Sequence, residues 1–139
     1  MKSDSPDGTV SWGVVLGEAI QRFYQSGFSE MEARWLVEEV AGCELVGASL
    51  DELVTNRKMA LYDNLLARRL SGEPLQYVLG HWQFRNLDLM IDQRVLIPRQ
   101  ETETVVDCVL TEVDRHSGEI LVADLGTGSG AIGLSVASE

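Results

Sequence analysis

The chain has 139 residues, a length that fits one or two small domains. Its hydrophobic content of 45% allows a packed core, and no apolar run approaches the ~20 residues of a transmembrane helix. The formal net charge of −11 is spread over both halves, which argues against non-specific binding of nucleic acid through a basic surface. The polar N-terminus lacks the pattern of a signal peptide, and Cys43 and Cys108 lack metal-ligand spacing. We therefore expect a cytoplasmic protein with reduced thiols and no metal site.

The N-terminal half is predicted to be helical. Residues 1–10 are polar and are expected to be a disordered leader, whereas residues 11–72 carry apolar stripes that predict a small helical bundle. The first stripe has apolar side chains three and four positions apart: Trp12, Val15, Leu16, Ala19, Ile20 and Phe23. A longer helix near the end of the bundle carries Met59, Tyr62, Leu65, Leu66 and Leu70. Helices that pack on one another explain these stripes, and a bundle of about 60 residues is marginally stable alone, which favours docking onto a neighbouring domain.

Two short patterns predict where helices begin inside the bundle. Ser29 and Glu32 have the spacing of a capping box and are expected to open the second helix. Ser49 and Glu52 repeat this spacing, which predicts a short helix through residues 50–54.

A linker is predicted after the bundle. The Gly-Glu-Pro sequence at 72–74 ends the helical region, and the pattern from residue 75 is predicted to be extended. Apolar and polar residues alternate over 87–92, as in a half-buried strand, and Asp92-Gln93 is expected to turn the chain into a second strand at 94–97. Residues 73–100 are therefore predicted to be a β-hairpin linker.

A second domain is predicted to begin at residue 101. Acidic residues in a first turn suit the positive end of a helix dipole, so Glu101 and Glu103 favour a helix that continues along an apolar face to Val113. The segment Ile120-Leu121-Val122-Ala123 has the length and β-branched content of a strand buried on both faces. A turn and another helix are expected to follow it.

The turn after this strand carries the strongest indication of a ligand. Asp124 lies at the carboxyl end of the predicted strand, where open α/β sheets bind ligands. Gly126, Gly128 and Gly130 allow backbone angles and close approach that a Cβ would forbid. A helix that begins near Gly130 would direct free N–H groups and the positive end of its dipole at a ligand.

Several ligand classes use such a turn. A phosphate-binding P-loop is excluded because no lysine follows the glycines. The sequence Asp-Leu-Gly-Thr-Gly-Ser-Gly at 124–130 resembles motif I of the class I methyltransferases that use S-adenosylmethionine (SAM). A dinucleotide cofactor and a plain structural turn without ligand remain open alternatives on this segment alone.

Two further blocks make the resemblance specific. The first, at 72–80, reads Gly-Glu-Pro-Leu-Gln-Tyr-Val-Leu-Gly, and Phe84 follows it. The second, at 95–103, reads Val-Leu-Ile-Pro-Arg-Gln-Glu-Thr-Glu. In this order, and with the glycine turn at the right distance, they closely resemble the peptide chain release factor glutamine methyltransferases, the HemK/PrmC family. The resemblance runs from about Trp12 to Glu139, with Gln100 where the family usually has proline.

The resemblance implies an α/β fold with an N-terminal helical bundle, a hairpin linker and a Rossmann-like class I methyltransferase domain. In this chain, residues 11–72 would be the bundle that engages the release factor, and residues 101–139 would be the start of the SAM-binding domain, with its first strand, turn and helix. The activity implied is transfer of a methyl group from SAM to the glutamine side-chain amide of the Gly-Gly-Gln motif in a release factor.

The site residues follow from the same resemblance, position by position. The implied cofactor contacts are Asp124, Gly126, Thr127, Gly128, Ser129 and Gly130. Weaker candidates for lining the site are Arg99, Glu101 and Thr102, although a structural elbow with helix-capping acids is the favoured explanation for them.

No catalytic residue can be assigned from the sequence. In the family, an Asn-Pro-Pro-Tyr motif after a later strand accepts hydrogen bonds from the amide, and these 139 residues contain no Asn-Pro. We expect an incomplete copy of the enzyme that is inactive alone, with residues after about 100 poorly ordered or self-associating. A noncatalytic release-factor-binding module is the main alternative, and the start of a nucleotide-cofactor enzyme is a further one.

Overall fold

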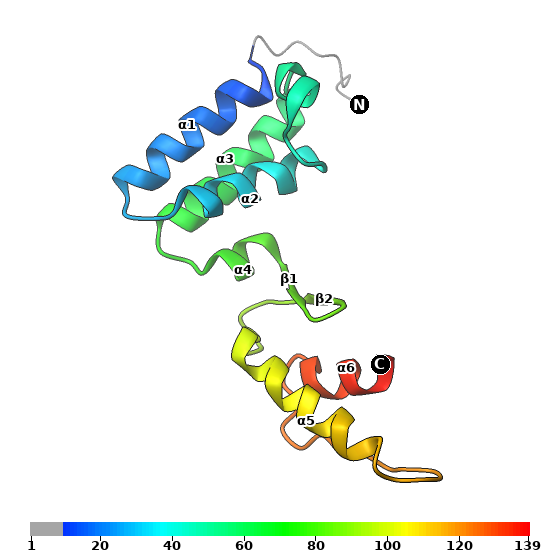
Figure 1. Ribbon diagram of the computed structural model, residues 1–139. Helices are drawn as coiled ribbons and strands as arrows, with labels where there is room; N and C mark the ends of the chain where they lie inside the picture. The colour runs from blue at the N-terminus through cyan, green and yellow to red at the C-terminus, as the bar shows by residue number, and fades with distance from the viewer. Residues whose placement is uncertain (1–9) are drawn as a thin grey trace. The chain divides into compact units, whose positions relative to one another are not determined.

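The computed structural model describes residues 10–139, so residues 1–9 of the predicted leader lie outside the described residues. The chain divides into two compact units, one that runs to Leu79 and one that spans Gly80–Glu139. Figure 1 labels the helices and strands of each unit. None of the helices within residues 10–139 has the length and apolar character needed to cross a membrane.

The first unit is helical, as the apolar stripes predict. It contains α1 (Trp12–Gln25), α2 (Glu30–Ala41), the 3-10 helix η1 (Gly47–Asp51), α3 (Asn56–Leu70) and the short α4 (Leu75–Leu79). Helix α2 packs against both α1 and α3. The backbone carbonyl of Val10 accepts a hydrogen bond of 3.0 Å from the N–H of Val54, so the last residue assigned to the leader belongs to the bundle.

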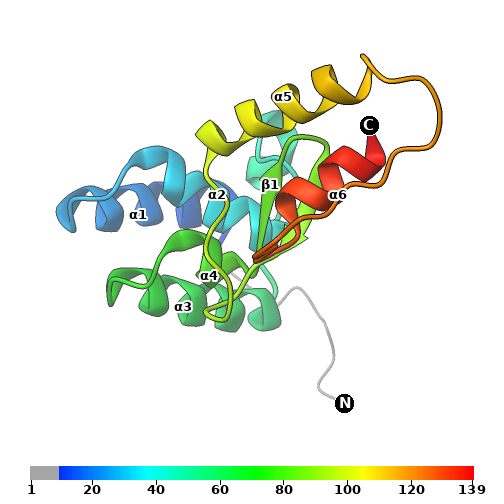
Figure 2. The same ribbon diagram turned by 90° about the horizontal axis from the view of Figure 1, so that it is seen from below.

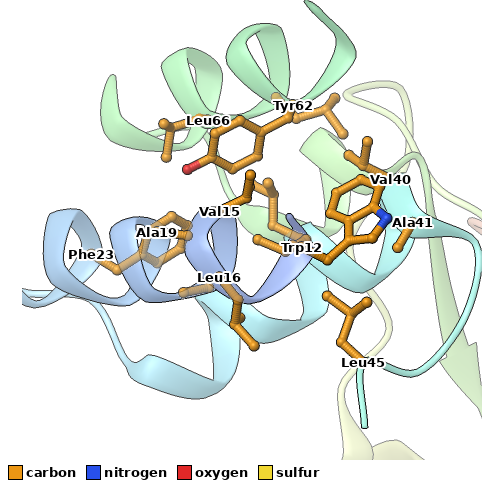
Figure 3. Packing of buried hydrophobic residues seen from close by; sticks show 14 of the residues in the cluster. Trp12, Val15, Leu16, Ala19, Phe23, Val40, Ala41, Leu45, Tyr62 and Leu66 are labelled. Atoms are coloured by element: carbon orange, nitrogen blue, oxygen red, sulfur yellow. The ribbon is translucent and has the colours of Figure 1, made fainter. Parts of the chain in front are cut away.

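One continuous apolar core holds this unit together. Figure 3 shows the buried side chains of α1 facing those of α2 and α3. The ring of Phe23 has no exposed surface and meets Phe28 edge-on, with 5.9 Å between the ring centroids. The Tyr62 ring from α3 lies in the same core, and its buried hydroxyl finds no hydrogen-bond partner among residues 10–139. Burial of this hydroxyl raises the pKa of Tyr62 to about 12, because the phenolate would have to leave water.

The two predicted capping patterns have different outcomes. The Ser29 hydroxyl accepts a hydrogen bond of 3.2 Å from the N–H of Glu32 at the start of α2, which confirms where this helix begins, while the Glu32 carboxylate contacts Arg69 and does not complete the box. The second is wrong, because Ser49 lies inside η1 and its hydroxyl accepts from the N–H of Val46 at 2.8 Å. Ser49 is the third residue of η1, so its hydroxyl supports the start of η1 at the preceding residues and does not open a helix at residue 50.

Residues 75–79 correct the prediction of an extended segment, because they form α4. The carbonyl of Pro74 accepts hydrogen bonds from the N–H groups of Tyr77 and Val78. Leu75 and Val78, three positions apart, are buried in the core of the bundle. A five-residue helix is too short to show a clear period in the sequence, so burial of these two side chains decides its conformation.

The hairpin exists, but the prediction placed it too late in the chain. Strand β1 (His81–Phe84) pairs antiparallel with β2 (Leu87–Met90), with Phe84 opposite Leu87. The predicted strand at 94–97 is absent, because the Asp92 carboxylate accepts from the N–H of Arg94 and holds a turn there. Burial of Phe84 and Leu89 selects the observed register.

The rest of the second unit is two helices and their connection. The 3-10 helix η2 (Gln100–Thr102) leads into α5 (Glu103–Val113), and α6 (Ala131–Ser138) packs against α5, beside it in Figure 2. The strand predicted at 120–123 does not form. Within residues 10–139 the sole ladder joins β1 to β2, and Leu121 is 97% exposed. A parallel strand needs neighbours to satisfy its backbone groups, and this segment has none.

Candidate functional site

The glycine turn has the backbone geometry that its sequence predicts. Gly126, Gly128 and Gly130 have φ values of 78°, 57° and 82°, all in the left-handed region that favours glycine. The N–H of Gly130 donates to the carbonyl of Thr127 at 2.8 Å, which closes the turn directly before α6. The spacing of the glycines therefore reflects a real sequence of backbone reversals at the start of a helix.

Asp124 joins this turn to α6 through a hydrogen bond. Its Oδ2 accepts a hydrogen bond of 3.0 Å from the N–H of Gly133, the third residue of α6. A Cβ on Gly133 would lie 3.0 Å from the same oxygen, so glycine at 133 permits the close approach. Asp124 thus caps a helix from nine positions away, and its negative charge lies at the positive end of the helix dipole.

The turn leaves room for a ligand above its backbone. A Cβ on Gly126 would meet no atom within 4 Å, and one on Gly128 would meet only a carbonyl oxygen at 3.9 Å. The N–H groups of Ala131 and Ile132 make no hydrogen bond within residues 10–139. Two free amide donors at a helix N-terminus beside open backbone fit an anionic or strongly polar ligand.

The weaker candidates for lining the site are not joined to this turn by side-chain hydrogen bonds within residues 10–139. Arg99 and Glu101 are exposed and Thr102 is half-buried, at and just before η2. No side-chain hydrogen bond joins any of the three to residues 124–130 in the described part of the chain. The N–H of Thr102 donates to the carbonyl of Arg99 at 3.0 Å, which is the geometry of an elbow that starts α5.

The first motif block, at 72–80, has a structural use in the bundle. Arg68, in the last turn of α3, makes a two-fold contact with the Glu73 carboxylate, with N···O distances of 2.8 and 2.6 Å. The same guanidinium donates to the carbonyls of Tyr77 and Val78 at the end of α4. Contact with Glu73 raises the pKa of Arg68. The block therefore folds the chain back onto α3 before the hairpin begins.

Arg69, the next residue of α3, is held by contacts with Phe28 and α2. Its guanidinium lies 3.6 Å from the ring centroid of Phe28 and contacts the Glu32 carboxylate at 2.7 Å. Arg69 also donates to the backbone carbonyl of Glu73 at 3.1 Å, so both adjacent arginines bond to Glu73, and the ion pair with Glu32 of α2 is made by Arg69.

Arg85 is the residue that the sequence analysis missed. It occupies the two-residue turn between β1 and β2 with a φ of 51°, and its guanidinium contacts the carboxylates of Asp107 in α5 and of Glu139, the residue after α6. An Arg-Asn turn carries no recognised signal for such contacts, because the partners are 22 and 54 positions away. Within residues 10–139 no cluster of histidine, cysteine and acidic residues could hold a metal ion.

Comparison with known proteins shows what the chain is similar to. Residues 15–80 match the family model of the PrmC N-terminal domain. The release factor glutamine methyltransferase of Bifidobacterium longum is 43% identical over 134 residues, which cover 90% of this chain. The chain is a relative of the release factor glutamine methyltransferases. Proteins of the same name from Moorella thermoacetica and Agrobacterium fabrum are 39% and 34% identical over 127 and 144 residues.

These relatives are longer than the matched region. The alignments cover 45%, 44% and 49% of the proteins from B. longum, M. thermoacetica and A. fabrum, and 88% and 99% of this chain for the last two. The chain therefore spans about half the length of the release factor glutamine methyltransferases that it matches, and it corresponds to their N-terminal portion.

Proposed function

We propose that this chain belongs to an enzyme that methylates the glutamine side-chain amide in the Gly-Gly-Gln motif of peptide chain release factors, with SAM as methyl donor. The observation that carries the proposal is the glycine turn that Asp124 caps, open above Gly126 and Gly128 and placed after both motif blocks. The name shared by the relatives supports the reaction and its protein substrate.

The proposed domains follow the motif blocks. Residues 11–72 would recognise the release factor, residues 73–100 would link the bundle to the site, and residues 101–139 would begin the Rossmann-like domain that binds SAM. The bundle has its own buried core, which supports its role as a separate recognition domain.

Bound SAM supplies a methyl group activated by the positive charge on sulfur. In this chain Asp124 would offer a carboxylate to the methionine ammonium, while Gly126, Thr127, Gly128, Ser129 and Gly130 would let the cofactor lie against the backbone. The free N–H groups of Ala131 and Ile132 would receive its carboxylate at the start of α6.

The substrate amide sets the requirement for positioning. Its nitrogen is a poor nucleophile because the lone pair is delocalised into the carbonyl group. The nitrogen must approach the methyl carbon in line as the carbon–sulfur bond breaks, and it then loses a proton. Holding the reactants in this geometry can supply roughly 7–11 kcal/mol of barrier reduction.

Calorimetric titration of the 139-residue chain with SAM tests the cofactor site. Asp124→Asn keeps an oxygen acceptor for the N–H of Gly133 but removes the charge, so we expect about tenfold weaker binding with the helix intact. Asp114→Asn, at the end of α5, removes the same charge from an exposed position and should leave the affinity unchanged. Equal affinities for both variants and the unaltered chain would contradict the role of Asp124.

Methyl transfer is tested with radiolabelled SAM and a release factor, by locating the label after proteolysis. The label should be in the glutamine of the Gly-Gly-Gln peptide, and a release factor with asparagine at that position should stay unlabelled. Capture of the release factor by the bundle without SAM binding would instead support the noncatalytic module. SAM binding with no affinity for a release factor would contradict the proposed substrate.

A further inference from the structure

The hairpin turn of the second unit contains an unusual arginine. Arg85 is the one residue other than glycine with a positive φ among those described, and its side chain is only 16% exposed. A long charged side chain in a surface turn normally extends into water. Here the two-residue turn between β1 and β2 accounts for the positive φ, and contacts with α5 and Glu139 bury the guanidinium.

All three nitrogen atoms of the Arg85 guanidinium donate hydrogen bonds, to α5 and to Glu139. Nε and Nη2 donate to the two carboxylate oxygens of Glu139, next to the end of α6, at 2.7 and 2.6 Å. Nη1 donates to the carboxylate of Asp107 at 2.6 Å and to the backbone carbonyl of Glu103 at 3.2 Å, both in α5. The backbone N–H of Arg85 donates to the Glu103 side chain at 3.2 Å.

These contacts favour the charged forms of both partners. The hydrogen bonds that Arg85 donates to the carboxylates of Glu139 and Asp107 raise the pKa of Arg85 and lower the pKa of Glu139. The two-fold contact with Glu139 also fixes a direction, because two parallel N–H···O bonds permit one relative orientation of guanidinium and carboxylate.

Helix α6 is consequently held at both ends. Asp124 holds its first turn through the N–H of Gly133, and Arg85 holds its far end through Glu139. A helix of eight residues is about 12 Å long, so movement at one end changes the position of the other. The glycine turn is joined directly to the first end.

We propose that Arg85 is a positioning residue that couples the hairpin to the glycine turn through α6, so that the hairpin helps to set the geometry of the cofactor site. The part of this inference that assigns the glycine turn to cofactor binding rests on the proposed function. The coupling of Arg85 to the turn does not. The coupling is a property of the second unit and is measurable without any ligand.

Hydrogen exchange of the Gly133 amide in the full chain tests the coupling. Arg85→Ala should accelerate this exchange by about threefold to tenfold, relative to amides at the end of α5 such as Val113. Arg85→Lys keeps the charge without the two-fold contact and should give a smaller acceleration. Arg115→Ala, which removes an exposed arginine paired within its own segment to Glu112, is the matched control and should change nothing.

The possible outcomes distinguish a failure of the Arg85 coupling from a failure of the cofactor site. Unchanged exchange at Gly133 in Arg85→Ala would overturn the inference, as would equal acceleration of every slow amide, which signals general loss of stability. Titration with SAM adds a second readout, in which Arg85→Ala should weaken binding about threefold to tenfold. If the unaltered chain does not bind SAM, the cofactor site fails, while the exchange of Gly133 still decides whether Arg85 acts on the turn.

Discussion

Replacement of Phe23 by alanine should remove a large part of the stability of the helical bundle. The Phe23 ring lies near the C-terminal end of α1, has no exposed surface and meets the ring of Phe28 edge-on. A buried phenylalanine covers about 150–250 Å², which corresponds to about 4–6 kcal/mol at about 25 cal/mol per Å². Measured core substitutions of this kind cost about 3–5 kcal/mol. A unit of about 70 residues has roughly 4–10 kcal/mol in total, so the variant should be close to unfolding.

The adjacent residue provides a matched control. Tyr24 is also aromatic and lies in the same helix, but it is 82% exposed, so Tyr24→Ala should change the free energy of unfolding by less than about 0.5 kcal/mol. Urea titration followed by the indole NMR signal of buried Trp12 measures both variants in the bundle itself. With a slope of about 1–3 kcal/mol per molar urea, Phe23→Ala should lower the midpoint by at least about 1 M. Equal midpoints for the two variants would refute the assignment of Phe23 to the core.

Two further predictions concern the stability of the bundle at high pH and the hydrogen exchange of residues 121–125. The raised pKa of Tyr62 means that the folded bundle keeps its proton above pH 10, so its contribution is full below pH 10 and is lost as pH rises towards about 12. Tyr62→Phe should abolish this alkaline loss in thermal melts, with little cost at neutral pH because the hydroxyl has no partner; an unchanged alkaline profile would contradict it. Amides at 121–125 should exchange within seconds in the monomer, since Leu121 and Leu125 are 97% and 92% exposed and the segment is unpaired. Strong protection of these amides would show that a strand forms there.

Local signals account for the parts of the fold that were predicted correctly. The stripes of α1 and α3 span several turns each, so their period of three to four residues is visible without knowledge of a partner. Ser29 caps α2 through a residue three positions away. The reversals at Gly126 and Gly128 follow from the absence of a Cβ, which is a property of each residue by itself.

The candidate site was predictable only in part. The residue types and order at 124–130 indicate a ligand-binding turn, but they do not show that the Asp124 carboxylate accepts from the N–H of Gly133. The predicted strand at 120–123 failed for a related reason, because a strand depends on neighbours that its own residues cannot specify. Arg85 was missed because its acidic partners are distant in the chain and common in composition.

The amino-acid sequence by itself determined the helices of the bundle, the backbone reversals of the glycine turn and the family to which the motif blocks point. These features depend on contacts within a few residues or on the order of residue types. The tertiary structure alone decided that residues 75–79 are helical, that Phe84 pairs with Leu87, and that Arg85 meets Glu139. Each of these outcomes depends on which side chains become buried together, and burial is a property of the folded chain as a whole.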